Sequence, residues 1–166
     1  MLSKKVILTG SFGVGKTSLF NRFVYSRFDE KYLTTIGVKV DKRTIEIDGR
    51  EISLLLWDIA GEVRQDKVPK SYFLGTSAIV YVIDLTRPST FDHVIGDLEY
   101  LKKNLPESPV FLVGNKIDLL SADELSARKT SFLVQPDLCT SAKTGENVEL
   151  LFNQIGAALL PNMATS

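Results

Sequence analysis

Cysteine is nearly absent from this 166-residue chain, which contains only Cys139. A single cysteine cannot form an intrachain disulfide, and such a composition fits a reducing compartment. Long hydrophobic runs are absent as well, because the longest apolar stretches, such as Ser77–Ile83, are far shorter than the roughly 20 residues that cross a bilayer. The apolar run near the start of the chain is also too short for a signal peptide. The sequence therefore predicts a cytoplasmic protein.

The chain also has no excess of positive or negative charge. Twenty Lys and Arg residues balance twenty Asp and Glu residues without a long run of one sign, so the composition does not indicate a nucleic-acid or anionic-membrane surface. No cluster of His, Cys or carboxylate residues suggests a metal centre or a nucleophile. Internal repeats, low-complexity tracts and linkers are also missing. At this length we expect one domain spanning residues 1–166.

Short apolar runs alternate along the chain with helical patterns. The runs are rich in branched residues, end at Gly, Asp or Thr, and are predicted to be buried strands: Lys5–Thr9, Ala78–Asp84, Val110–Gly114 and Leu138–Thr140. Two helical faces are predicted, one from Phe91, Val94, Ile95, Leu98 and Leu101, the other from Val148, Leu151, Phe152, Ile155 and Leu159. This alternation predicts an α/β fold with a parallel sheet and helices on both faces.

One pair of strands departs from the parallel pattern. Val38–Ile47 and Glu51–Trp57 flank Asp48–Gly49, a dipeptide that suits a tight hairpin with positive φ angles. The full prediction is a six-stranded, mostly parallel sheet with one antiparallel edge strand. Ser121, with Glu124 three residues later, also predicts a capping box at the start of a further helix.

The segment Gly10–Thr17, which we call the phosphate loop, fits the pattern G-x-x-x-x-G-K-[ST]. It follows a predicted strand and opens a predicted helix, which is the context that the motif requires; the alternative is a glycine-rich turn with an incidental lysine. Loop N–H groups and the helix N-terminus attract phosphate, Lys16 adds a full positive charge, and the Thr17 hydroxyl suits Mg²⁺. The residues predicted to hold the phosphates are Gly13, Val14, Gly15, Lys16, Thr17 and Ser18.

A phosphate loop alone is shared by kinases, ATPases and GTPases, so the base must be identified elsewhere. Val113–Asp118 follows a predicted strand and presents Asn115, Lys116 and Asp118 at its carboxyl end, where ligands of parallel sheets bind. A carboxylate can accept hydrogen bonds from N1–H and the exocyclic amine of guanine, and adenine lacks this donor pair. The presence of Asp118 therefore predicts that the base is guanine, and we expect the aliphatic stem of Lys116 to lie across its ring. A second segment, Thr140–Lys143, adds Ser141, Ala142 and Lys143, with the Ala142 N–H aimed at the guanine O6.

In the order GSFGVGKT, TTIGVKV, WDIAGE, GNKID and TSAK, the chain resembles the Ras superfamily of small GTPases over nearly its whole length. TTIGVKV and WDIAGE are similar to the Rab branch. The resemblance implies binding of GTP and GDP with Mg²⁺, hydrolysis of GTP, and protein partners: an effector, an exchange factor and an activating protein. An ATP-dependent kinase or ATPase would require Asn115–Asp118 to have no function.

The resemblance also implies roles for particular positions. Thr35 would bind Mg²⁺ and the γ-phosphate; Gly37, two residues later, favours it over Thr34. Asp58 would hold Mg²⁺ through a water molecule, and the N–H of Gly61 would contact the γ-phosphate. Phe28 would pack against the guanine and Tyr32 would cover the phosphates. The first switch would be Lys31–Val38 and the second switch Ile59–Ser71, and the predicted catalytic group is Lys16, Thr35, Gly61 and Glu62.

Two positions differ from the family pattern and both affect hydrolysis. Phe12 stands where a small residue is usual, and Glu62 stands where the family usually has glutamine. We expect the Phe12 side chain to point away from the phosphates yet crowd the attacking water, which predicts slow hydrolysis. The alternatives are a purely structural Phe12 and a protein that holds GTP without hydrolysing it. Glu62 could activate the water, or Arg64 or Gln65 could replace the usual glutamine.

The last predictions concern partners and membranes. The chain ends in LPNMATS and begins Met1–Leu2, so neither prenylation nor myristoylation is encoded. We consider two alternatives: the protein works unanchored, as a prokaryotic relative would, or a tail has been removed. The apolar residues of the second switch are candidates for partner contact or for burial against the protein's own helices: Ile59, Val63, Val68, Tyr72 and Phe73.

Overall fold

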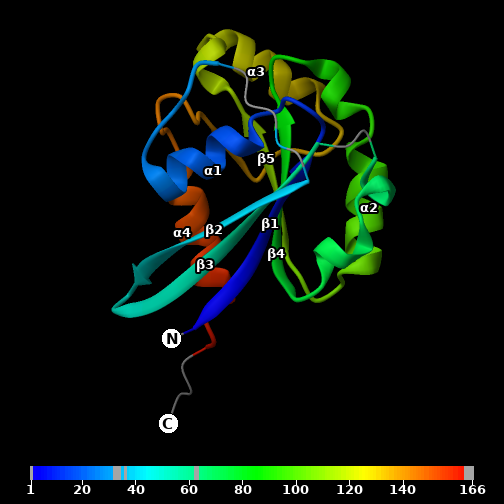
Figure 1. The fold of residues 1–166 in the computed structure, drawn as a ribbon. Coiled ribbons are helices and arrows are strands. Elements are labelled where there is room, and N and C mark those ends of the chain that lie inside the picture. Colours follow the sequence, from blue (N-terminus) through cyan, green and yellow to red (C-terminus); the bar gives the residue numbers. More distant parts are fainter. Residues whose placement is uncertain (1, 32–34, 36, 62–63, 163–166) are drawn as a thin grey trace.

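The central sheet has the order β2-β3-β1-β4-β5-β6 (Figure 1) within the part of the chain that the computed structural model describes, residues 2–31, 35, 37–61 and 64–162. The strands are β1 (Ser3–Gly10), β2 (Val38–Ile47), β3 (Arg50–Ile59), β4 (Thr76–Asp84), β5 (Val110–Asn115) and β6 (Leu138–Thr140). β2 pairs antiparallel with β3, and the other pairings are parallel. The predicted sheet with its reversed edge strand is confirmed.

The β2–β3 hairpin turns at the predicted dipeptide. Asp48 and Gly49 have φ angles of 51° and 77°, the left-handed conformation that matches the twist of the flanking strands. Pairing continues from Ile47 opposite Arg50 to Val38 opposite Ile59. The start of β2 and the end of β3 therefore lie at the same end of the sheet as the last residues of β1. The hairpin therefore brings both predicted switch segments to the phosphate loop.

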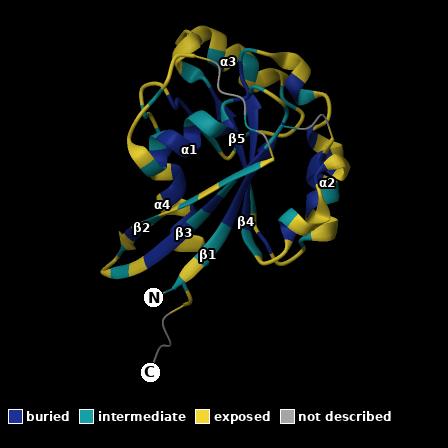
Figure 2. Ribbon diagram, in the orientation of Figure 1, coloured by how far each residue is buried: buried dark blue, intermediate teal, exposed yellow. Residues whose placement is uncertain are grey.

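Helices cover both faces of the sheet, as predicted. α1 (Lys16–Tyr25) and α4 (Val148–Leu159) pack on one face, and α2 (Val94–Asn104) lies on the other with α3 (Ala122–Ser131) beside it. Figure 2 shows the buried sides of α1, α4 and α2 turned toward the sheet. The capping box of α3 is confirmed: the Glu124 N–H donates to Ser121 Oγ at 3.1 Å, and the Glu124 carboxylate accepts from the Ser121 N–H.

The predicted helical face of α2 is wrong at two positions. Phe91 lies in a separate 3₁₀ turn, η3 (Pro88–Phe91), because proline is favoured in the first turn of a helix and starts one here. α2 begins only at Val94, and its buried apolar residues follow the helical repeat from there: Val94, Leu98 and Leu101. Ile95 falls outside this face and is 43% exposed.

After β3 the chain forms two 3₁₀ turns, η1 (Gln65–Lys67) and η2 (Lys70–Phe73). Ile59, Val68 and Phe73 are buried in the core beneath α2, so burial rather than partner contact accounts for these three residues. Tyr72 is half-buried, with its ring centroid 6.4 Å from that of Trp57. Val63 lies outside the described residues. None of the described helices is both long and apolar enough to span a membrane.

Candidate nucleotide-binding site

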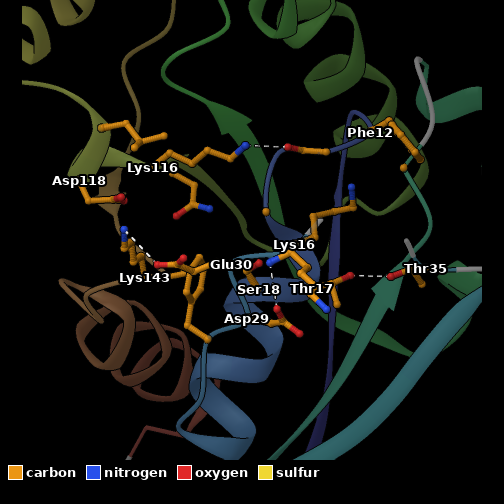
Figure 3. A pocket seen from close by; sticks show the side chains of 18 of the residues that line it. Phe12, Lys16, Thr17, Ser18, Asp29, Glu30, Thr35, Lys116, Asp118 and Lys143 are labelled. Atoms are coloured by element: carbon orange, nitrogen blue, oxygen red, sulfur yellow. Dashed lines mark hydrogen bonds and ion pairs between the residues drawn. The ribbon is translucent and has the colours of Figure 1, made fainter. Parts of the chain in front are cut away.

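A cavity of about 420 Å³ lies at the carboxyl ends of the parallel strands, within the usual size range of small-molecule sites (Figure 3). Most of the predicted binding residues line it: Gly13, Gly15, Lys16, Thr17, Ser18, Phe28, Thr35, Gly61, Asn115, Lys116, Asp118, Ala142 and Lys143. The sheet thus brings together five segments that are far apart in the sequence.

Three predicted residues lie directly behind this surface. Val14, Asp58 and Ser141 are fully buried, and each binds a residue that lines the cavity. Tyr32 and Glu62 lie outside the described residues, so their predicted roles stay predictions.

Lys16 is the buried cation of the phosphate loop. Its Nζ donates to the carbonyl oxygens of Gly10 at 3.3 Å and Ser11 at 2.8 Å. Burial lowers the pKa of Lys16 to about 8, although the charge of Asp58 opposes the shift. The ammonium group is therefore held over the loop where a phosphate would supply the missing counter-charge.

Three successive carbonyl groups of the phosphate loop are bound from outside the loop. The Phe12 oxygen accepts from Arg87 Nη2 at 2.7 Å, and the Gly13 oxygen accepts from Lys116 Nζ at 3.0 Å. The Val14 oxygen accepts from Asn115 Nδ2 at 3.2 Å. These three contacts hold the backbone of the phosphate loop from outside it.

Asp84 organises the two cations of this arrangement. Its Oδ2 lies 3.0 Å from Arg87 Nε and 2.8 Å from Lys116 Nζ. Burial alone would raise the pKa of Asp84, but hydrogen bonds from Lys116 and Thr86 outweigh it and hold the pKa below its usual value. Asp84 and Arg87 were not predicted as site residues, because neither belongs to a recognised motif.

The residues predicted to bind the base are joined by hydrogen bonds. Asn115 Oδ1 accepts from Thr140 Oγ1 at 3.0 Å, and Asp118 Oδ1 accepts from Ser141 Oγ at 2.7 Å. The two motifs that were read separately from the sequence therefore form one unit, in which Ser141 orients the Asp118 carboxylate.

Arg22 of α1 supports the same end of the cavity. Its Nε donates to the Ala142 oxygen at 2.7 Å and its Nη2 donates to the Lys143 oxygen. Lys143 in turn lies 3.6 Å from Glu30, and Figure 3 shows these two side chains pointing toward one another. Sequence reasoning missed Arg22, and it missed four residues that line the cavity: Asp29, Glu30, Ile59 and Leu119.

Oxygen atoms of three predicted metal ligands converge near the start of α1. Thr17 Oγ1 lies 2.5 Å from Asp58 Oδ2 and 2.5 Å from Thr35 Oγ1, and Thr35 Oγ1 donates to Asp58 Oδ2 at 3.1 Å. Asp58 Oδ1 is buried and has no hydrogen-bond partner among the described residues. Burial raises the pKa of Asp58 despite the bonds from Thr17 and the charge of Lys16. Two hydroxyls and a carboxylate with an unsatisfied oxygen fit Mg²⁺, which prefers oxygen ligands.

The second switch begins in contact with the phosphate loop. A Cβ atom on Gly61 would lie 2.5 Å from Phe12 Cα and 2.7 Å from Phe12 N, so only glycine permits this approach. The Ala60 N–H donates to the Gly37 oxygen at 2.9 Å, which links the second switch to the first. Phe12 lies at the end of the cavity opposite Asp118 (Figure 3), and its side chain is 54% exposed.

Arg64 and Gln65, the two candidates for replacing the usual glutamine, do not line the cavity. Arg64 pairs with Asp66 at 2.6 Å. Gln65 is completely buried, and its Oε1 accepts from Thr9 Oγ1 at 2.7 Å. In this arrangement neither side chain is placed to orient a water molecule in the cavity.

Comparison with known proteins decides the family. The sequence profile of the Ras family matches residues 5–160. The chain belongs to the Ras family. It is 38% identical to the Ras-related protein RabJ of Dictyostelium discoideum over 97% of this chain and 65% of that protein. It is 35% identical to Ras-related protein Rab-1 of Theileria parva and of Theileria annulata, over 93% of this chain and 73% of each relative.

These relatives make this family member Rab-like, as the sequence motifs predicted. They give no support to a prokaryotic origin. The chain spans 65% of the length of RabJ, so the curated relative contains sequence that this chain does not match.

Proposed function

We propose that this protein is a guanine-nucleotide switch that binds GTP and GDP with Mg²⁺ and hydrolyses GTP slowly. The observation that carries the proposal is the convergence, in one cavity, of the phosphate loop, the Thr17–Thr35–Asp58 oxygen cluster and the Ser141–Asp118 pair. Each supplies one part of the recognition: phosphate, metal and base. Membership of the Ras family supports the same function.

Guanine selection rests on Asp118. Its carboxylate lines the cavity and accepts one hydrogen bond from Ser141, which leaves lone pairs for the N1–H and the exocyclic amine of guanine. The Lys116 stem lines the same part of the cavity, and its ammonium group is bound to Gly13 and Asp84. The aliphatic part of this side chain is therefore fixed in place to contact the ring.

Hydrolysis would proceed by attack of water on the γ-phosphate. Lys16 and the N–H groups of the phosphate loop stabilise the negative charge that develops on the phosphate oxygens, and the Gly61 N–H donates to the γ-phosphate. Thr17, Thr35 and Asp58 would hold Mg²⁺, which would supply further charge neutralisation. Loss of the γ-phosphate removes the ligands that hold Thr35 and Gly61, which releases both switch segments.

Phe12 and Glu62 favour a slow reaction. Phe12 lines the cavity, and its backbone lies against Gly61, so its ring would crowd the region that the attacking water must enter. Glu62 would bring a negative charge toward the γ-phosphate. The same two residues favour a second candidate function, a module that holds GTP persistently without hydrolysing it.

The remaining parts of the proposal follow the family. We expect one domain over residues 1–166, a cytoplasmic location, and an effector, an exchange factor and an activating protein that bind through the switches. Nothing in the charge pattern favours nucleic acid as a partner.

Base specificity is tested by displacement of labelled GDP. Unlabelled GTP should displace labelled GDP from the wild-type protein, and ATP should not. In the Asp118→Asn variant an amide donor replaces one carboxylate acceptor, so GDP affinity should fall by about 10²- to 10⁴-fold, the value of two charge-assisted hydrogen bonds. Xanthosine diphosphate, which carries a carbonyl oxygen in place of the amine, should then compete better than GDP.

A matched control is Asp123→Asn, which changes an exposed aspartate of α3 away from the cavity and should leave GDP affinity unchanged. Displacement by ATP as readily as by GTP would refute guanine selection. Single-turnover conversion of bound GTP to GDP with Mg²⁺ then separates the two candidate functions, because only the switch converts its nucleotide.

A further inference from the structure

Four buried polar side chains connect the second switch to α2 on the face of the sheet opposite α1. They are Thr9 at the end of β1, Gln65 in η1, Tyr81 in β4 and Asp97 in the first turn of α2. Tyr81 belongs to a core cluster that is otherwise apolar. None of the four lines the nucleotide cavity, so the proposed nucleotide chemistry does not account for them.

The four residues form a continuous chain of hydrogen bonds, which passes through the backbone N–H and the side chain of Gln65. Asp97 Oδ2 accepts from the Tyr81 hydroxyl at 2.5 Å, and Asp97 Oδ1 accepts from the Gln65 backbone N–H at 3.1 Å. Gln65 Oε1 then accepts from Thr9 Oγ1 at 2.7 Å. Thr9 directly precedes Gly10, so this chain runs from helix α2 through the second switch to the start of the phosphate loop.

The carboxylate of Asp97 lowers the stability of the fold at this buried position unless other groups bind it. It is only 5% exposed, and transfer of a carboxylate from water into a protein interior costs several kcal/mol unless hydrogen bonds compensate it. Burial raises the pKa of Asp97 despite the bonds from Tyr81 and Gln65, while the nearby charges of His93 and Asp66 act in opposite directions. An apolar side chain would fill the space without this cost, but only an acceptor can hold the Gln65 N–H.

Gln65 is held close in the sequence to the contact between the second switch and the phosphate loop. Gly61 lies against the backbone of Phe12, and Gln65 is bound by Asp97 and Thr9. Only three residues separate Gly61 from Gln65 in the sequence. Asp97 therefore fixes the second switch at Gln65, a few residues after Gly61.

We propose that Asp97 is a positioning residue for hydrolysis, which acts by anchoring Gln65 and so holding the second switch in place just after Gly61. The proposal rests on the proposed function, because it names a residue that sets the rate of that reaction. Gln65 Nε2 is buried without a hydrogen-bond partner among the described residues, so the anchor is incompletely satisfied. Such a contact is easier to release than a fully satisfied one, as a switch requires.

The anchor is tested first without hydrolysis. Trypsin cleaves after Arg64 and Lys67, two exposed residues that flank Gln65. In the GDP complex, Asp97→Ala should be cleaved at these bonds at least about tenfold faster than the wild type, because local opening limits cleavage of a folded segment. Asp97→Asn keeps an acceptor for the Gln65 N–H and should be cleaved at nearly the wild-type rate. The matched control is Glu99→Ala, which removes an exposed acid from the same helix.

Single-turnover hydrolysis then separates positioning from a structural role. Asp97→Ala should convert GTP at least about tenfold more slowly with GDP affinity within threefold of wild type, and Asp97→Asn should recover most of the rate. Faster cleavage with an unchanged hydrolysis rate would reduce Asp97 to a structural residue, and unchanged cleavage would remove the anchor altogether. Wild-type protein that converts no GTP would refute hydrolysis as a function and with it the positioning role, whatever the cleavage pattern.

Discussion

Replacement of Phe12 by alanine should accelerate GTP hydrolysis. Phe12 lines the end of the cavity, and its backbone lies against Gly61. In the proposed reaction its ring would restrict the approach of water to the γ-phosphate. A misplacement of about 1 Å at a reacting centre can cost roughly 100-fold in rate, so removal of the ring should raise the single-turnover rate constant by about 10- to 100-fold.

The same substitution should affect folding and binding little. The side chain is 54% exposed, and full burial of a phenylalanine stabilises a protein by about 1.5–3 kcal/mol, so the loss of stability should be about 1 kcal/mol. Arg87 binds the main-chain oxygen of Phe12, which every substitution retains, and GDP affinity should therefore stay within threefold.

The assay is chromatography of nucleotide from protein loaded with GTP, started with Mg²⁺ and sampled over minutes to hours. Phe12→Gly should also accelerate the reaction, and a faster rate in both variants would assign the effect to the ring. Leu133→Ala serves as the control, since this residue is 89% exposed and does not line the cavity. A rate within twofold of wild type in both Phe12 variants, at unchanged GDP affinity, would refute the steric argument.

Two further predictions concern Arg87 and Asp97. Arg87→Ala removes the donor to the Phe12 oxygen and should speed GDP dissociation by about 5- to 15-fold, less than the full value of a charge-assisted hydrogen bond because the Arg87 side chain is 44% exposed; stopped-flow release of a fluorescent GDP analogue measures this, and an unchanged rate would contradict it. Burial raises the pKa of Asp97, so ionisation of this carboxyl is less favourable in the folded state than in the unfolded state. The free energy of unfolding of the wild type should therefore fall, relative to that of Asp97→Asn, as pH rises from about 4 through the raised pKa. Urea unfolding of both proteins between about pH 4 and pH 7 gives this difference, and the explanation fails if the difference does not change with pH.

The sequence predicted those parts of the site in which side-chain identity carries the chemistry. Lys16, Thr17 and Asp118 are recognisable because phosphate, metal and guanine each demand one kind of group at a fixed place after a strand. The hairpin was equally predictable, because Asp48–Gly49 suits the backbone geometry of its turn.

Other parts could not be read from the sequence. Arg87 and Arg22 bind main-chain oxygens that lie 75 and 120 residues away in the chain, and a carbonyl acceptor leaves no trace in the sequence. Gln65 was a candidate to replace the usual glutamine as a water positioner. Its burial depends on acceptors and donors from Asp97 and Thr9, on two other elements, so no local pattern could indicate it.

The three bound carbonyl groups of the phosphate loop also affect how tightly a nucleotide is held and how fast it exchanges. Since Arg87, Lys116 and Asn115 hold the loop through contacts within the protein itself, folding rather than binding should supply much of the order of the loop. Affinity and thermal stability should therefore share one set of contacts. Drawing one of these side chains away from its carbonyl group would loosen the loop without any group entering the nucleotide cavity.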